Sequence, residues 1–182
     1  MKMDYYKKQL YLARVDKNDQ ILGRVERWEA HQKAVLHRGI HLAVFFQDKI
    51  ILQQRRHPAF NGYFDITIAS HPLFIGDKLQ DDLTALYTTL NRELNLEKAD
   101  LISPPQFLGK FHYQAKNPHD PRLQEHEINH VYSCEAKAIP IPNYEFAYGL
   151  SVVTKADLGQ DNNFIRPFLT PWTKKAQQLK LF

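Results

Sequence analysis

Glu125, His126 and Glu127 form the run of side chains in this sequence that is best suited to chemistry. On a β-strand successive side chains point to opposite faces, so Glu125 and Glu127 share one face and His126 lies on the other. Two carboxylates on one face repel each other unless a cation or a proton lies between them. The spacing therefore indicates a divalent metal site, and the alternative is an ordinary solvated strand face.

Three histidines are candidates for completing such a site. His31 and His37 lie six residues apart, where we expect one short helix that ends just before a buried strand, and His71 precedes Pro72 at a strand end. Three imidazoles with two carboxylates suit an octahedral Mn²⁺ or Mg²⁺ better than a four-coordinate structural zinc. Each histidine alone is more often a structural or surface residue, and spacing does not establish that they converge.

Two further charged positions indicate phosphate chemistry. Arg55 and Arg56 follow an apolar strand, where their donors could bind phosphate oxygens. Glu93, on a long helix, could hold a second metal ion through substrate phosphates. The alternative for these residues is simple solvation of a strand end and of a helix face.

The elements that must position these residues follow from periodicity and turn signals. Leucines at positions 83, 86, 90 and 94 predict a helix over 81–96, and Asn95 is a residue that tolerates the left-handed geometry of a helix end. We also expect a helix over 26–36, a final helix beginning at Pro171, and extended segments at 11–15, 20–25, 40–46, 49–54, 60–70, 107–115, 125–134 and 146–153. This mixture predicts an α+β fold with a mostly antiparallel or mixed sheet and few helices.

Length and composition predict one domain over residues 1–182, since 182 residues with 43% hydrophobic content can bury a core without disulfides. The net charge of +4 comes from scattered residues, which argues against a nucleic-acid partner. Cys134 is the single cysteine, and no apolar run reaches the length of a signal peptide or a membrane span. We therefore expect a cytoplasmic protein without a membrane partner, either a monomer or a homodimer.

Six short motifs occur in the order found in one family: Glu29-Ala30-His31, Leu36-His37-Arg38-Gly39, Leu52-Gln53-Gln54-Arg55-Arg56, Ser70-His71-Pro72-Leu73, Glu125-His126-Glu127-Ile128 and Thr170-Pro171-Trp172. In these motifs the chain resembles the type I isopentenyl diphosphate isomerases of the Nudix superfamily, from about Val15 to Trp172. The resemblance implies a Nudix fold, an α/β/α sandwich with a mixed sheet flanked by helices.

The resemblance also implies roles for individual residues. It assigns a metal site to His31, His37, His71, Glu125 and Glu127, with Mn²⁺ or Mg²⁺ as the cofactor. Further, Glu93 would hold Mg²⁺ on the diphosphate, and Arg27 and Arg55 would bind phosphate. For catalysis, Glu127 with Tyr113 would transfer a proton, and the ring of Trp172 would stabilise a carbocation.

The sequence departs from the family where the second proton-transfer group is a cysteine, because Ala69 stands there. The family's helix arginine falls at Thr89, and the segment after Arg56 is too short to supply a further lysine. We therefore expect a metal-dependent protein that binds or acts on a small diphosphate, with an altered or lost isomerase step. The alternatives are a Nudix pyrophosphohydrolase of organic or nucleoside diphosphates, although only Glu93 of that motif survives in residues 88–93, and a non-catalytic diphosphate-binding protein.

Overall fold

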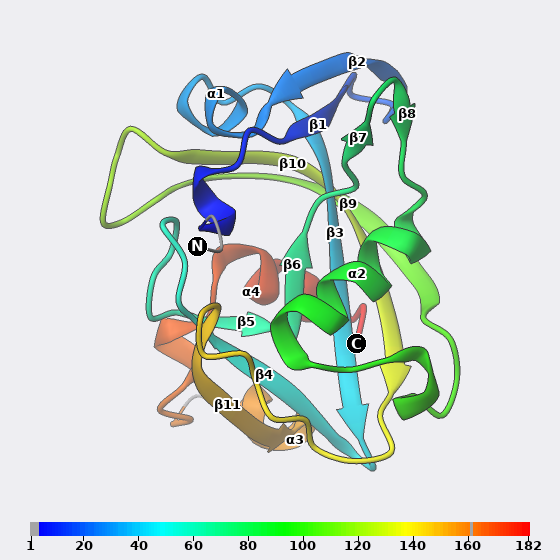
Figure 1. The fold of residues 1–182 in the computed structure, drawn as a ribbon. Helices are drawn as coiled ribbons and strands as arrows, with labels where there is room; N and C mark the ends of the chain where they lie inside the picture. The colour runs from blue at the N-terminus through cyan, green and yellow to red at the C-terminus, as the bar shows by residue number, and fades with distance from the viewer. Residues whose placement is uncertain (1–3, 161) are drawn as a thin grey trace.

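A mixed β-sheet forms the centre of the molecule (Figure 1). The computed structural model describes residues 4–160 and 162–182, and nine strands of this part of the chain join the sheet. They are β1 Tyr11–Val15, β2 Ile21–Glu26, β3 His37–Phe46, β4 Lys49–Arg55, β5 Phe64–Ile66, β6 Ile68–Ser70, β9 Gln106–Lys116, β10 Gln124–Glu135 and β11 Ala147–Thr154. A separate hairpin joins β7 Phe74–Ile75 to β8 Lys78–Leu79.

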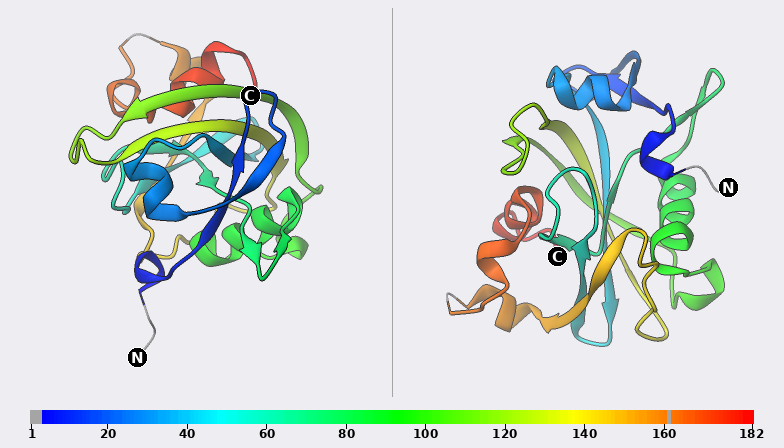
Figure 2. Two further views of the ribbon diagram at one scale, coloured as in Figure 1. Left: turned by 90° about the horizontal axis from the view of Figure 1, so that it is seen from above. Right: turned by 60° about the vertical axis from the view of Figure 1, so that its left-hand side comes forward.

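The helices are α1 Arg27–Gln32, α2 Asp82–Leu94, α3 Lys155–Gly159 and α4 Pro171–Gln178, with 3-10 turns η1 Tyr5–Lys7, η2 Lys98–Asp100 and η3 Arg166–Phe168. The α2 and α4 helices lie on opposite sides of the sheet (Figure 2). Among the helices that the structure describes, none combines the length and the hydropathy of a membrane span.

Alternating side chains of β3 and β4 supply the two apolar cores of this sandwich. Leu42, Val44 and Ile51 pack with the buried residues of α2 on one face. On the other face Ile50 and Leu52 pack with the apolar residues of α4. The α+β class and the α/β/α layers predicted from the sequence are therefore confirmed.

The pairing of β3 determines the geometry of the site. It runs parallel to β10 along one edge, with His37 beside Glu127, whereas the other paired strands of the sheet are antiparallel. On its other side β3 pairs with β6 through residues 40–42 and then with β4 through residues 44–46. Thr67 lies between β5, which pairs with β4, and β6, which pairs with β3. Its hydroxyl accepts from the Val44 N–H and donates to the Ile51 carbonyl.

The α2 helix begins and ends as its sequence predicts. The side chain of Asp81 accepts from the Thr84 N–H at 2.9 Å, and Asn95 ends the helix in left-handed geometry with φ 53°. Leu86 and Leu90 are fully buried, but Leu83 in the first turn is 40% exposed.

The helix expected over 26–36 is wrong in its extent. It ends at Gln32, and Ala34 takes the left-handed φ of 49°, which breaks the helical path. As a result, His37 begins β3 and does not end a helix. The α3 helix and the β7–β8 hairpin have no counterpart in the elements expected from the sequence.

Candidate active site

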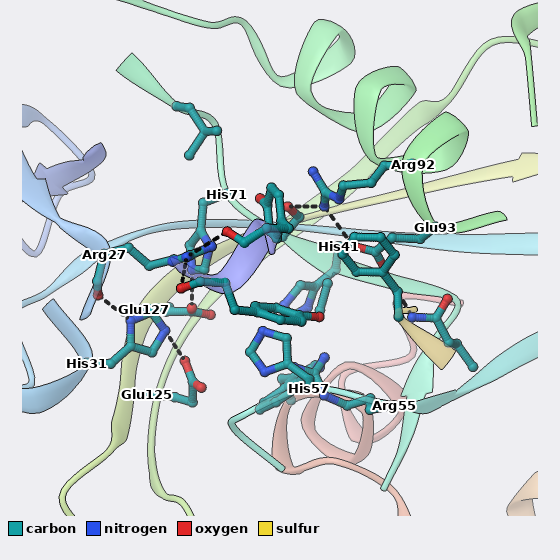
Figure 3. A pocket seen from close by; sticks show the side chains of 18 of the residues that line it. Arg27, His31, His41, Arg55, His57, His71, Arg92, Glu93, Glu125 and Glu127 are labelled. Atoms are coloured by element: carbon teal, nitrogen blue, oxygen red, sulfur yellow. Dashed lines mark hydrogen bonds and ion pairs between the residues drawn. The ribbon is translucent and has the colours of Figure 1, made fainter. Parts of the chain in front are cut away.

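Four side chains from separate elements converge at one end of the sheet. His31 comes from α1, His37 from the start of β3, His71 from the segment after β6, and Glu127 from β10. One potential ligand atom from each lies within 4.8 Å of the others. Figure 3 shows His31, His71 and Glu127 pointing toward one another.

Backbone carbonyls fix the orientation of two of these imidazoles. His31 Nδ1 lies 2.7 Å from the Arg27 carbonyl oxygen, and His37 Nδ1 lies 2.7 Å from that of Val35. Because a carbonyl only accepts, each Nδ1 carries the hydrogen, and in the neutral ring the lone pair is on Nε2. This orientation is typical of histidines that ligate metal ions.

The Glu127 carboxylate joins the histidines to a tyrosine. Its Oε1 lies 2.8 Å from His71 Nε2, while its Oε2 accepts from the Tyr113 hydroxyl at 2.8 Å. The Nε2 of His37 lies 3.3 Å from Oε1 but lacks hydrogen-bond geometry, and it has no other partner among the described residues. A buried, unpartnered nitrogen beside a carboxylate fits a position where a metal ion binds.

The protonation of the site follows from burial and from neighbouring charges. Burial opposes ionisation of Glu127, but His37 and His71 outweigh it and hold the pKa of this carboxyl well below its usual value. Burial, with the Glu127 charge, raises the pKa of Tyr113 well above 10. Tyr113 therefore keeps its proton and donates it in a hydrogen bond to an ionised carboxylate.

Glu125 lies beside this group but outside it. Its Oε2 is 3.1 Å from His31 Nε2, and both side chains are buried. Burial disfavours the charge on His31, yet the Glu125 carboxylate outweighs burial and raises the pKa of His31 to about 9. The predicted alternation along the strand is confirmed, since His126 lies on the other face, 3.0 Å from His112.

The three imidazoles and the Glu127 carboxylate fit a divalent cation by donor type, orientation and burial. Imidazole nitrogens with a carboxylate oxygen are typical ligands of a transition-metal ion, whereas Mg²⁺ prefers oxygen donors alone. Without an ion, the His31 imidazolium balances the negative charge of Glu125, which lies at the edge of the four-residue group. A bound cation would supply the positive charge that the carboxylates need at its centre.

A cavity of about 50 Å³ adjoins the four-residue group, and Arg27 and Arg92 both line it. The Nε of each guanidinium is buried and has no hydrogen-bond partner among the described residues. The ring of Tyr5 lies against both, with its centroid 4.2 Å from Arg92 Cζ and 5.1 Å from Arg27 Cζ. Arg27 also donates to backbone carbonyls of the N-terminal segment, including that of Tyr6 at 2.9 Å.

Glu93 and Arg55 line the cavity but are engaged elsewhere. Glu93, on α2, accepts from Gln53 at 3.1 Å and pairs with Arg92 at 2.6 Å, so it is not part of the histidine group. Arg55 forms a buried ion pair with Asp65, which also accepts from the Trp172 indole N–H. The charge of Arg55 is therefore already paired, since Nη1 donates to Asp65 while Nε and Nη2 donate to the Ala59 carbonyl.

Sequence reasoning missed several residues of this cavity, and three of them bear on the chemistry of the site. Arg92 gave no signal beyond its place next to Glu93, and Tyr5 gave none. His41, in contrast, follows His37 and Gly39 at a period of two, which predicts one shared face of a strand. That signal was present in the sequence.

Comparisons with known proteins identify relatives of this chain. The chain is 30% identical over 179 residues to the isopentenyl-diphosphate Delta-isomerase of Dictyostelium discoideum, covering 87% of this chain and 74% of that protein. It is 31% identical over 141 residues to the enzyme of the same name from Pectobacterium atrosepticum, covering 72% and 73%. No family model matches the sequence.

Among solved structures, a MutT NUDIX hydrolase from Burkholderia pseudomallei superposes with a TM-score of 0.54 at 19% identity. The superposition covers 79% of this chain and 96% of that one. This likeness shows that the two chains share a fold.

Proposed function

This chain belongs to the isopentenyl-diphosphate Delta-isomerase family of the Nudix superfamily, and we propose that it binds a small organic diphosphate with divalent metal ions and carries a modified isomerase step. The observation that carries the proposal is the convergence of three imidazoles and one carboxylate beside a cavity with two unpartnered guanidinium nitrogens. Isopentenyl diphosphate is the first substrate to test, because the relatives are named for it.

In this proposal His31, His37, His71 and Glu127 hold Mn²⁺, with Glu125 next to His31. Glu93, which pairs with Arg92 in this structure, would hold Mg²⁺ through the phosphates of the substrate. When bound, these ions supply positive charge to the phosphate oxygens and to the Glu127 carboxylate.

Arg27 and Arg92 are the proposed diphosphate-binding residues. Their free Nε–H groups are donors that phosphate oxygens would satisfy, and both line the cavity. Arg55 supports the site differently, because its ion pair with Asp65 orients the Trp172 indole.

The proton chemistry begins with the hydrogen-bonded pair of Tyr113 and Glu127. This pair can deliver a proton to the terminal alkene carbon, and the π-face of Trp172 can stabilise the resulting tertiary cation. Ala69 carries only a methyl group, so the proton that must leave the neighbouring carbon needs an acceptor other than residue 69.

A pyrophosphohydrolase is the second candidate function, since water activated by metal ions needs no cysteine. It is less well supported, because the hydrolase motif needs several carboxylates on this helix, and the described residues of α2 bring one to the cavity, that of Glu93. A phosphate-release screen over nucleoside diphosphates and prenyl diphosphates tests it. Release from any member in the presence of Mg²⁺ would favour hydrolysis over isomerisation.

The proposed metal and ligand binding is tested by calorimetry and thermal unfolding of the metal-free protein. We expect stoichiometric Mn²⁺ binding, a higher Tm with Mn²⁺, and a further rise with isopentenyl diphosphate and Mg²⁺. Mutation of a residue that only supports a metal ligand typically weakens metal binding by about 10- to 100-fold. His71→Ala removes a proposed ligand itself, so it should weaken Mn²⁺ binding by about 100-fold or more.

The matched control is His112→Ala, which removes an exposed imidazole on the other face of the same sheet. It should bind Mn²⁺ as the wild type does. Equal Mn²⁺ affinity in the wild type and His71→Ala would contradict the proposed metal site. A diphosphate affinity that does not change with Mg²⁺ concentration would contradict the proposed Mg²⁺ ion at Glu93.

A further inference from the structure

His41 lies directly across from Ala69 on the neighbouring strand. In the antiparallel pairing of β3 with β6, His41 and Ala69 are register partners. Side chains of such partners share one face of the sheet, with Cβ atoms about 5 Å apart. Both residues line the cavity, so the imidazole is the functional group nearest in register to the methyl group of residue 69.

The His41 imidazole is buried and available. Its side chain is on a residue only 1% exposed, and its Nδ1 has no hydrogen-bond partner within the described ranges 4–160 and 162–182. Burial outweighs the attraction of the Glu127 charge and lowers the pKa of His41 to about 3. The ring is therefore neutral at pH 7, and one of its nitrogens carries a lone pair.

The position of Trp172 relates His41 to the other proton-transfer pair. The Trp172 ring centroid lies 6.0 Å from that of His41 and 5.8 Å from that of Tyr113. Tyr113 and Glu127 come from β9 and β10 on one side of β3, whereas Ala69 comes from β6 on the other side. His41 lies on β3 between them, so a cation held at the indole would have the Tyr113–Glu127 pair in reach on one side and His41, beside residue 69, on the other.

We propose that His41 is the catalytic residue that accepts the second proton in this site, in the place that Ala69 cannot fill. This inference rests on the proposed function and deepens it. Figure 3 shows His41 among the labelled side chains of the same cavity as Glu127 and His71.

The step balances without any redox partner. The alkene π-electrons take a proton from the Tyr113–Glu127 pair at the terminal carbon, which becomes a methyl group and leaves a tertiary cation. His41 then removes a proton from the adjacent CH₂, and the electron pair of that C–H bond forms the new double bond. A C–H bond beside a carbocation is strongly acidic, so a weak base is sufficient. Exchange with solvent returns the proton from His41 and reprotonates the Tyr113–Glu127 pair.

The other histidines that line the cavity already have partners or assigned roles. The Nδ1 of His57 accepts from the Ala59 N–H at 2.9 Å, and His31 and His71 belong to the metal group. Cys134 packs in the core on the α2 face of the sheet, away from Trp172.

The experiment follows isopentenyl diphosphate in D₂O with Mg²⁺ and Mn²⁺, using wild type, His41→Asn, Ala69→Cys and the double variant. NMR measures both conversion to dimethylallyl diphosphate and deuterium incorporation at the terminal CH₂ of unconverted substrate. We expect His41→Asn to lower conversion by about 100- to 10,000-fold, the usual contribution of a general base. Terminal deuterium exchange should persist within a few-fold, because it needs only Tyr113 and Glu127.

The double variant and one added control variant separate catalysis from structure. Ala69→Cys in the His41→Asn background should restore conversion at least tenfold over His41→Asn, because a thiolate would replace the missing base. His112→Asn, at an exposed site, should match the wild type. A purely structural role for His41 would lower conversion, exchange and Mn²⁺ binding together, and that result would overturn the proposal.

The remaining outcomes distinguish this inference from the proposed function. If the wild type converts the substrate and His41→Asn does so within fivefold, the role of His41 is wrong and the proposed function stands. If the wild type shows neither conversion nor terminal exchange, the isomerase step itself is absent, and the role of His41 is overturned with it.

Discussion

At the scale of single residues, the candidate site depends on the absence of a side chain at Gly39. This residue lies on β3 between His37 and His41. A Cβ atom there would lie 2.0 Å from Asn129 Oδ1 and 2.8 Å from Glu127 Oε2. The glycine therefore leaves the space in which the Glu127 carboxylate reaches the histidines.

Gly39→Ala should displace the side chains of Asn129 and Glu127 and weaken Mn²⁺ binding at least tenfold, because the added carbon would occupy the space through which the carboxylate reaches the histidines. Overpacking of this kind also costs about 1–3 kcal/mol of unfolding free energy. Calorimetric titration and urea unfolding measure the two effects. Gly149→Ala, where nothing lies within 4 Å of the added carbon, is the control and should change neither. Unchanged Mn²⁺ affinity in Gly39→Ala would contradict the assignment of Glu127 as a ligand.

At the scale of elements, Asp19 joins the β1–β2 turn to three strands of the sheet. Its Oδ1 accepts from Arg38 Nε on β3 at 2.9 Å, and its Oδ2 accepts from Lys110 Nζ on β9 at 3.0 Å. His130 of β10 lies 2.6 Å from Asp19 and 2.6 Å from Asp82 of α2. This cluster fixes the strands that carry His37, Tyr113 and Glu127.

Asp19→Asn should destabilise the protein by about 2 kcal/mol at pH 7, the scale of hydrogen bonds to a charged group. Burial opposes ionisation, but the hydrogen bonds from Lys110 and His130 outweigh it and lower the pKa of Asp19 below its usual 3.8. Because the folded pKa is the lower one, the stabilisation is present above pH 3.8 and is lost as pH falls through the folded pKa.

Urea unfolding at pH 7 and at successive steps below pH 3.8 checks this prediction. The gap between wild type and Asp19→Asn should narrow on acidification, whereas the exposed control Asp48→Asn should show little gap at any pH. A gap that stays constant with pH would show that the charge of Asp19 is not what stabilises the fold.

At the scale of the whole molecule, the N-terminal segment covers the site. The cavity of about 50 Å³ is far below the roughly 300–1,000 Å³ of typical ligand pockets. The Tyr5 ring lies over Arg27 and Arg92 and packs edge-on against the Phe146 ring, with 5.6 Å between the two ring centroids. We therefore expect a diphosphate to reach the two arginines only when Tyr5 moves away.

Tyr5→Ala should accelerate the association of Mg²⁺-diphosphate several-fold and tighten its apparent Kd, because binding no longer includes the cost of opening. Stopped-flow fluorescence with inorganic diphosphate measures both constants. Tyr144→Ala, at a side chain 59% exposed, is the control for loss of a tyrosine. Slower association in Tyr5→Ala would indicate that the ring helps to hold the ligand and does not exclude it.

The sequence alone determined the local features of this protein. Alternation separated Glu125 and Glu127 from His126, and the period of α2 with Asn95 at its end gave that helix nearly to the residue. These features depend on neighbours a few residues away, which periodicity and capping describe.

Only the tertiary structure decided which side chains meet. The parallel register that sets His37 beside Glu127 joins strands 90 residues apart, and no local pattern specifies such a register. The same holds for Asp65, which neutralises Arg55, and for Ala69, which the β3–β6 pairing sets opposite His41. Local periodicity can say which face a side chain occupies, but long-range strand pairing decides what lies across from it.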